Sequence, residues 1–208
     1  MSEVPVLRPS EDGEPEEERQ EDATPEAEAA PEEAAPEAAA PEAEHAPGEF
    51  KVPSGYKVLT GSPTGNRRAV AVVVAKFNGD VTRRMLETAL EELERTGVAP
   101  EAVTIVPVPG AFELPLAAMA LAKTRKYACI VALGCVIRGE TPHFDYVAGE
   151  AASGLQLAGI ETGVPIGFGV LTTETFEQAE ARIDRAADAV RTALEMADVF
   201  QQVRTAAR

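Results

Sequence analysis

Residues 128–147 read ACIVALGCVIRGETPHFDYV, and this stretch decides how the chain folds. Its first part, 128–133, is apolar throughout, as in a strand that is covered on both faces of a sheet. A glycine-flanked crossing segment follows, after which Thr141 suits the N-cap of a helix and Pro142 suits its first position. The stretch therefore predicts a buried strand that is followed closely by a helix.

His143 is the one histidine beyond residue 50, and it falls in the first turn of this predicted helix. The backbone N–H groups at a helix start have no partner within the helix, so they attract anions, and phosphate above all. The same helix end disfavours an imidazolium, so we expect His143 to be neutral and able to accept a proton near pH 7. A phosphate site and a proton-transfer group within a few residues of each other indicate enzyme chemistry.

Strand and helix patterns alternate on both sides of this stretch. Apolar runs predict strands at 69–75, 103–108, 128–133 and 165–171, with a further short strand at 56–59. Helical spacing predicts helices over 81–93, 113–126, from 141 to about 158, and from 173 to near the end. Such alternation indicates right-handed β-α-β units. We therefore predict an α/β fold, a three-layer αβα sandwich of flavodoxin-like type with a four-stranded parallel sheet and helices on both faces.

Each of the four main predicted strands ends in a distinctive segment. These segments are 77–79, 109–113, 135–143 and 172–174. In open parallel sheets the ligand lies beyond the carboxyl ends of the strands. We therefore expect all four segments to meet at one edge of the sheet and to form a site there.

The negative charge of the chain is concentrated in its first part. The whole chain has a net charge of -16, and residues 1–50 hold 17 of its 35 acidic residues but two of its 19 basic ones. This part is rich in Ala, Pro and Glu, so it has too few large apolar side chains to form a core. We predict a disordered acidic arm over 1–50 and a folded domain over 51–208. A solubilising extension and a specific docking segment both remain open as roles for the arm.

The remaining composition excludes several protein classes. The two cysteines lie on one predicted strand, roughly 20 Å apart, which is too far for a disulfide and fits a reducing, cytoplasmic compartment. No run of residues approaches a membrane span, and the start lacks the basic and apolar regions of a secretory signal. The sequence contains no cluster of Cys and His residues of the kind that would indicate a metal site.

The segments at the strand ends resemble those of the lumazine synthase family of riboflavin biosynthesis. The matching pieces are Phe77-Asn78, 108–115, 133–147 and 168–174, in the family's order and spacing, and the resemblance spans about residues 55–182. It implies the condensation of 5-amino-6-(D-ribitylamino)uracil with 3,4-dihydroxy-2-butanone 4-phosphate to 6,7-dimethyl-8-ribityllumazine, with release of phosphate and water. It also implies a transferase that uses no metal or redox cofactor.

The resemblance assigns roles to individual residues. For the pyrimidine and its ribityl chain it implies Phe77, Ala111, Phe112, Glu113, Cys135, Val136, Ile137 and, across a subunit boundary, Phe168. For phosphate it implies the backbone of Glu140 and Thr141, together with Arg182 from the neighbouring subunit. His143 would be the proton shuttle, and Cys135 has no nucleophilic role.

Each assignment has a plain structural alternative. Phe77 and Phe168 suit ordinary packing at a strand, and Glu113 suits a charge that stabilises a helix start. His143 suits a structural cap, and Arg182 suits a solvated helix surface. The residues alone leave these alternatives open.

The chain departs from the family after Arg182. The family usually has a break with Gly, Asn and Lys before its last helix, whereas residues 182–193 here are shorter and contain neither Gly nor Lys. Ala and Arg favour helix, so the two C-terminal helices either fuse or turn differently. Arg185 is a candidate replacement for the missing lysine charge near the phosphate.

Three functions therefore compete. The first is an active lumazine synthase that assembles as a pentamer or a multiple of pentamers, has sites between subunits and has riboflavin synthase as a candidate partner. The second is a shell-forming homologue with weak or no catalysis, and the third is a module that binds a flavin-like ligand. The combination of a phosphate site with a base argues against the third. Nothing in the sequence indicates a nucleic acid or a membrane as partner.

Overall fold

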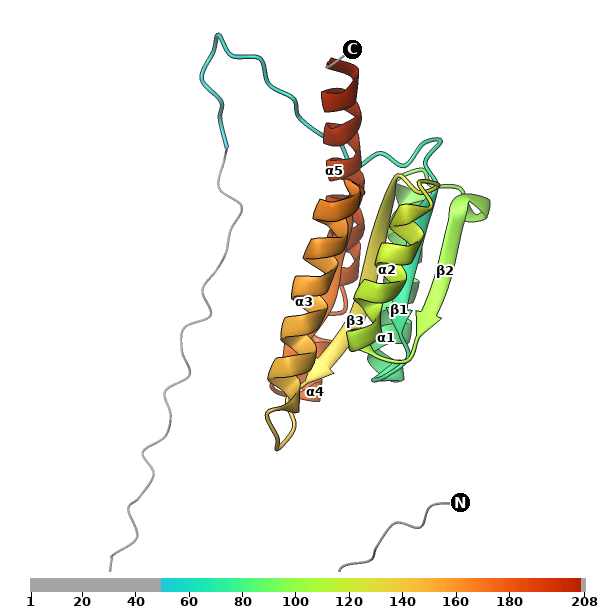
Figure 1. Cartoon of the computed structure of the whole chain (residues 1–208), viewed down its shortest axis with the longest axis vertical. Helices are drawn as coiled ribbons and strands as arrows, with labels where there is room; N and C mark the ends of the chain where they lie inside the picture. Colours follow the sequence, from blue (N-terminus) through green and yellow to red (C-terminus); the bar gives the residue numbers. More distant parts are fainter. Residues whose placement is uncertain (1–49, 207–208) are drawn as a thin grey trace, which may run out of the picture. The chain divides into compact units, whose positions relative to one another are not determined.

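The computed structural model describes residues 50–206, so residues 1–49 of the predicted acidic arm lie outside the described residues. Strands and helices alternate along this part of the chain (Figure 1). The elements are β1 (Val70–Ala75), α1 (Gly79–Arg95), η1 (Pro100–Ala102), β2 (Val103–Val108), η2 (Ala111–Glu113), α2 (Leu114–Lys123), β3 (Cys129–Ile137), α3 (His143–Thr162), β4 (Ile166–Thr173), α4 (Phe176–Glu180) and α5 (Arg185–Ala206).

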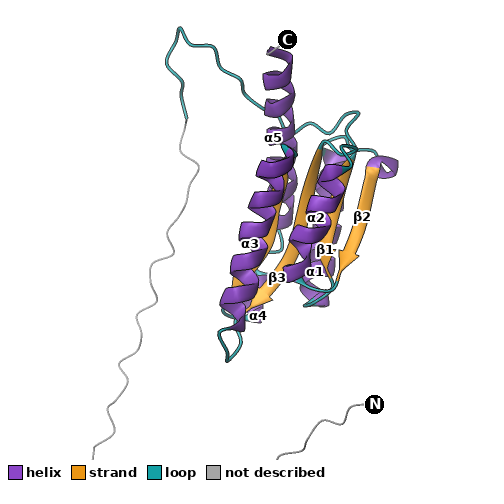
Figure 2. Ribbon diagram, in the orientation of Figure 1, coloured by secondary structure: helices purple, strands orange, loops and turns teal. Residues whose placement is uncertain are grey.

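The four strands form one parallel sheet in the order β2-β1-β3-β4. Helices α2 and α3 pack on one face of the sheet, and α1 and α5 pack on the other (Figure 2). Because every strand runs in the same direction, the carboxyl ends of all four lie at the same edge. The predicted α/β sandwich with a four-stranded parallel sheet is confirmed.

Strand β1 lies at the centre of the sheet, and its side chains alternate between two cores. Val70, Val72 and Val74 pack with α1 and α5, whereas Ala71 and Val73 pack with α2 and α3. All six residues of β1 are buried. The continuous apolar run in the sequence therefore arises because both faces of this strand are covered by helices.

Two predicted strands differ from the structure. Residues 56–59 form no strand, because this short, largely exposed segment pairs with no other strand. Strand β3 continues to Ile137, four residues beyond the predicted end at Leu133. Position 134 suits glycine because a Cβ atom there would lie 3.0 Å from Leu114 Cδ1. The strand continues past this glycine because its residues pair with β4.

The start of α3 also differs from the prediction. The helix begins at His143 with Pro142 at the N-cap, and no side chain caps it. The prediction that Thr141 is the N-cap is therefore wrong. Such a shift of one residue is common at helix ends. His143 still lies in the first turn.

The two C-terminal helices stay separate. Helix α4 ends at Glu180 and α5 begins at Arg185, with a turn between them in which Arg185 N donates to Arg182 O at 3.0 Å. Ile183 is buried against the core, so it anchors this turn although the segment contains no glycine. The sequence left open whether these helices fuse or turn, and the structure has a turn between them.

No helix of residues 50–206 has the length and apolar character needed to span a membrane.

Candidate active site

A pocket of about 540 Å³ lies at the carboxyl edge of the sheet. Its walls come from the loops after β1 and β2, from the end of β3 and from the first turns of α3. The predicted site residues that line it are Phe77, Ala111, Phe112, Glu113, Cys135, Val136, Ile137, Thr141 and His143. Three of the four segments that were expected to meet at this edge therefore share one pocket.

Asn78 fixes the loop after β1. It adopts the left-handed conformation, with φ 55°, which Asn tolerates better than most residues. Its side-chain amide donates to the Cys135 carbonyl oxygen at 2.9 Å, so it connects this loop to the end of β3. Phe77, which is 69% exposed, is thereby held at the mouth of the pocket. The sequence reasoning gave Asn78 no role, although an Asn-Gly pair two residues after a buried strand is a signal for such a turn.

Glu113 is held locally as well as lining the pocket. Its carboxylate accepts a hydrogen bond from the Gly110 N–H at 2.9 Å, and this contact closes the turn that begins η2. Glu113 therefore also stabilises the start of a helix, which was the structural alternative to a binding role for this residue. The carboxylate has further lone pairs that can accept hydrogen bonds from a ligand.

The end of β3 forms the floor of the pocket. Cys135 and Val136 are buried, and Ile137 is partly buried. Burial raises the pKa of the Cys135 thiol to about 11, so this group is protonated at neutral pH and is a poor nucleophile. Both cysteines are free, as their predicted separation along one strand requires.

The loop between β3 and α3 makes few hydrogen bonds to the rest of the described chain. Among residues 50–206, no hydrogen bond is formed by Gly139, Glu140 or Thr141. Gly139, Thr141 and the exposed His143 line the pocket, whereas Glu140 does not. The N–H groups of Gly139, Glu140 and Thr141 are thus available to an anion.

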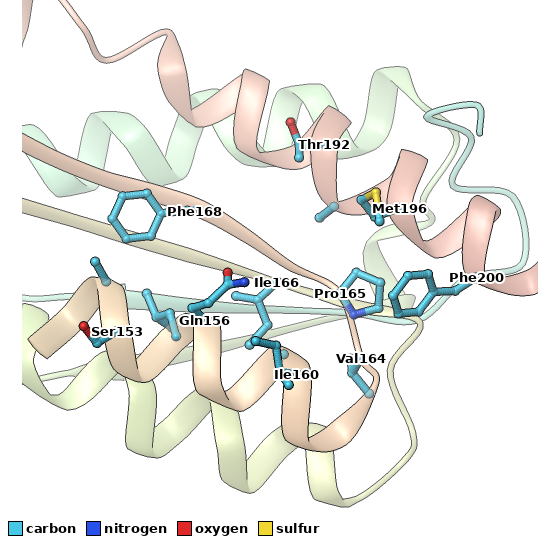
Figure 3. Close-up of a pocket in the computed structure, with 14 residues that line it drawn as sticks. Ser153, Gln156, Ile160, Val164, Pro165, Ile166, Phe168, Thr192, Met196 and Phe200 are labelled. Atoms are coloured by element: carbon cyan, nitrogen blue, oxygen red, sulfur yellow. The ribbon is translucent and has the colours of Figure 1, made fainter. Parts of the chain in front are cut away.

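Besides Glu140, two predicted site residues lie outside this pocket in the single chain. Phe168 is paired with Ala132 within the sheet, and it lines a separate apolar groove of about 610 Å³ between α3 and α5. Figure 3 shows its ring beside β4, with Gln156 and Ile160 from α3 on one side and Met196 from α5 on the other. We call this hollow the β4 groove.

Arg182 is exposed in the turn between α4 and α5. Its guanidinium donates to the Gln178 carbonyl oxygen at 2.9 Å, so it contacts the preceding helix α4. Arg185, one turn further on, lines a hollow that also contains Phe168, and it pairs with Asp188 at 3.1 Å. Neither arginine reaches the pocket at the sheet edge within one chain.

The segment after β4 is connected to this edge by Arg138, a residue to which the sequence reasoning gave no role. Arg138 follows β3 directly, and its guanidinium pairs with Glu174 after β4 and with Asp145 on α3. Within residues 50–206, no group of three or more His, Cys, Asp or Glu residues could hold a metal ion.

The fold and this edge define a class of protein. The chain is a doubly wound α/β protein with a pocket at the carboxyl ends of parallel strands, where β1 and β3 are neighbours, which is the usual place of a ligand in such sheets.

A family model for 6,7-dimethyl-8-ribityllumazine synthase matches residues 67–201. The chain belongs to this family, which connects it with riboflavin biosynthesis. The match begins just before β1 and ends within α5, so it includes every strand and every segment that lines the pocket.

Proposed function

We propose that the chain condenses 5-amino-6-(D-ribitylamino)uracil with 3,4-dihydroxy-2-butanone 4-phosphate to form 6,7-dimethyl-8-ribityllumazine. The proposal rests mainly on one observation: the aromatic ring of Phe77, the carboxylate of Glu113 and the imidazole of His143 line the same pocket. The amine of the pyrimidine and the ketone of the second substrate would form an imine with loss of water. Phosphate would then leave, and ring closure with loss of a second water would give the product.

The pyrimidine would lie between Phe77 and the end of β3. A flat heterocycle can stack on the exposed ring of Phe77. The main-chain groups of Cys135, Val136 and Ile137 would bind its edge. The loop with Ala111, Phe112 and Glu113 would contact the ribityl chain, and the carboxylate of Glu113 would accept hydrogen bonds from its hydroxyl groups.

The phosphate would bind at the loop before α3. The unpaired N–H groups near Glu140 and Thr141 and the positive end of the helix dipole favour a dianion there. His143 lies two residues after Thr141, so it would transfer protons during imine formation and phosphate loss. Proton transfer by a positioned side chain is worth roughly 10²- to 10⁴-fold in rate. Binding both substrates in one orientation supplies a further part of the acceleration.

We also propose that the site is completed by a second copy of the chain, in a pentamer or a multiple of pentamers. Phe168 is 49% exposed on an edge strand, where it lines the apolar β4 groove and not its own chain's pocket at the sheet edge. Exposed apolar side chains on α3, such as Leu157 and Ile160, extend this surface. A neighbouring copy that covers it would bring Phe168 and Arg182 to the pocket of that copy.

A rate assay with both substrates, followed by absorbance of the lumazine product, tests the reaction. We expect turnover well above the uncatalysed rate, and a reduction of roughly 10²- to 10⁴-fold in His143→Ala. Only the uncatalysed rate in the wild-type protein would refute the enzyme and favour a shell-forming homologue. An unchanged rate in His143→Ala would remove this residue from the mechanism.

Mixing two variants tests the shared site. His143→Ala and Arg182→Ala each damage a different side of the proposed interface. When the two chains are unfolded together and reassembled, some sites regain both intact residues, so part of the activity should return. No recovery in mixed assemblies whose composition is verified by native mass spectrometry would contradict a site between subunits.

A further inference from the structure

Beside the pocket, Arg138 contacts the end of β4, the residue that follows it and the start of α3. Its backbone N–H donates to the Thr173 carbonyl oxygen of β4 at 2.9 Å. Its side-chain Nε lies 2.9 Å from a carboxylate oxygen of Glu174, and an Nη lies 3.2 Å from Asp145. The guanidinium carbon also lies 4.1 Å from the ring centre of Phe144, a residue that lines the pocket.

These contacts enclose the loop that would bind phosphate. Arg138 stands at one end of residues 139–142, and its partners Phe144 and Asp145 stand just beyond the other end. Gly139, Glu140 and Thr141 form no hydrogen bonds within residues 50–206. The geometry of this loop therefore depends on how firmly its two ends are held.

The contacts of Arg138 contribute little to global stability. The side chains of Asp145 and Glu174 are 61% and 60% exposed, and exposed ion pairs of this kind add roughly 0–1 kcal/mol. An arginine has nevertheless two features that a lysine lacks here. Its planar fork can reach two carboxylates at once, and it can stack on an aromatic ring.

We propose that Arg138 is a positioning residue, which holds the loop 139–142 and the start of α3 against the end of β4. The N–H groups of the loop and the imidazole of His143 then face the pocket in one fixed arrangement. The inference rests on the proposed function for the identity of the ligand. It is tested separately by the binding of inorganic phosphate, which needs no turnover.

The first test compares variants of the whole chain by calorimetric titration with inorganic phosphate. We expect Arg138→Ala to weaken phosphate binding roughly five- to tenfold, the size of one impaired charge-assisted contact. In the rate assay, KM for the phosphate substrate should rise by a similar factor, while KM for the pyrimidine stays within about twofold. Arg83→Ala is the matched control, because Arg83 forms an exposed ion pair with Glu87 on α1.

The sign of a second variant separates positioning from simple charge. Glu174 is an anion near the proposed phosphate site, so electrostatics alone predicts that Glu174→Ala strengthens phosphate binding. Positioning predicts that it weakens binding, because Arg138 loses its contact with the end of β4. Arg138→Lys keeps the charge without the fork, and we expect it to recover less than half of the lost affinity.

Several outcomes would overturn the inference. These are tighter or unchanged binding in Glu174→Ala, full recovery in Arg138→Lys, and wild-type protein that binds no phosphate. Failure of the proposed function has a different signature. In that case the wild-type chain forms no lumazine product, while Arg138→Ala still weakens the binding of phosphate.

Discussion

Asn78 offers a prediction whose size follows from its geometry. Replacement by glycine removes the hydrogen bond to the Cys135 carbonyl, at a cost of about 1 kcal/mol, but keeps the left-handed backbone at φ 55° accessible. Replacement by alanine removes the same bond and adds about 1–2 kcal/mol of backbone strain. We therefore expect the free energy of unfolding to fall by about 1 kcal/mol in Asn78→Gly and by about 2–3 kcal/mol in Asn78→Ala.

Urea denaturation followed by circular dichroism measures these differences. All variants are compared at one protein concentration, because dissociation and unfolding are linked in an assembly. Asn78→Asp is a further control, since it tolerates the left-handed conformation but places an acceptor against the carbonyl oxygen of Cys135. It should be less stable than Asn78→Gly at neutral pH. An alanine variant as stable as the glycine variant would refute the reasoning from backbone strain.

Three further predictions concern other parts of the chain. Burial acts to raise the pKa of Glu92, but hydrogen bonds from Arg95 and Arg191 outweigh burial and hold the pKa below its ordinary value of 4.5. The ionised Glu92 carboxylate therefore stabilises the fold at pH values above 4.5, so Glu92→Gln should be about 1–2 kcal/mol less stable than the wild-type protein at pH 7. This difference in stability should vanish as the pH falls through the folded-state pKa of Glu92. Equal stability of the two proteins at pH 7 would be evidence against this. Because burial raises the pKa of the Cys135 thiol to about 11, iodoacetamide at pH 8 should leave turnover unchanged, and rapid inactivation with labelling of Cys135 would contradict this account. Deletion of residues 1–50 should also leave turnover unchanged, which the rate assay checks, and a large loss would give the acidic arm a catalytic role.

The fold could be predicted because its signals are local. The apolar run of β1 indicates a strand that is covered on both faces, and the same pattern recurs in β3. Helical spacing between such runs leaves few topologies other than a parallel sheet. The convergence of three strand-end segments in one pocket then follows from the common direction of the strands.

Other features depend on contacts that the sequence does not display. The end of β3 was misplaced because Gly134 suggests a turn, whereas in the structure it allows Leu114 to approach the strand. The roles of Asn78 and Arg138 depend on partners 57 and 36 positions away, at Cys135 and Glu174, that only the fold brings near. Likewise, Phe168 does not line the pocket in the single chain, and only the proposed assembly would bring it there from a second copy.

The most direct test is a crystal structure of the whole chain with a non-reactive analogue of the lumazine product and inorganic phosphate. We expect the heterocycle to stack on Phe77, the phosphate to contact the N–H groups of residues 139–141, and Phe168 and Arg182 of an adjacent copy to complete the site. A ligand bound in the β4 groove, or a pocket at the sheet edge that stays remote from every neighbouring copy, would contradict the account.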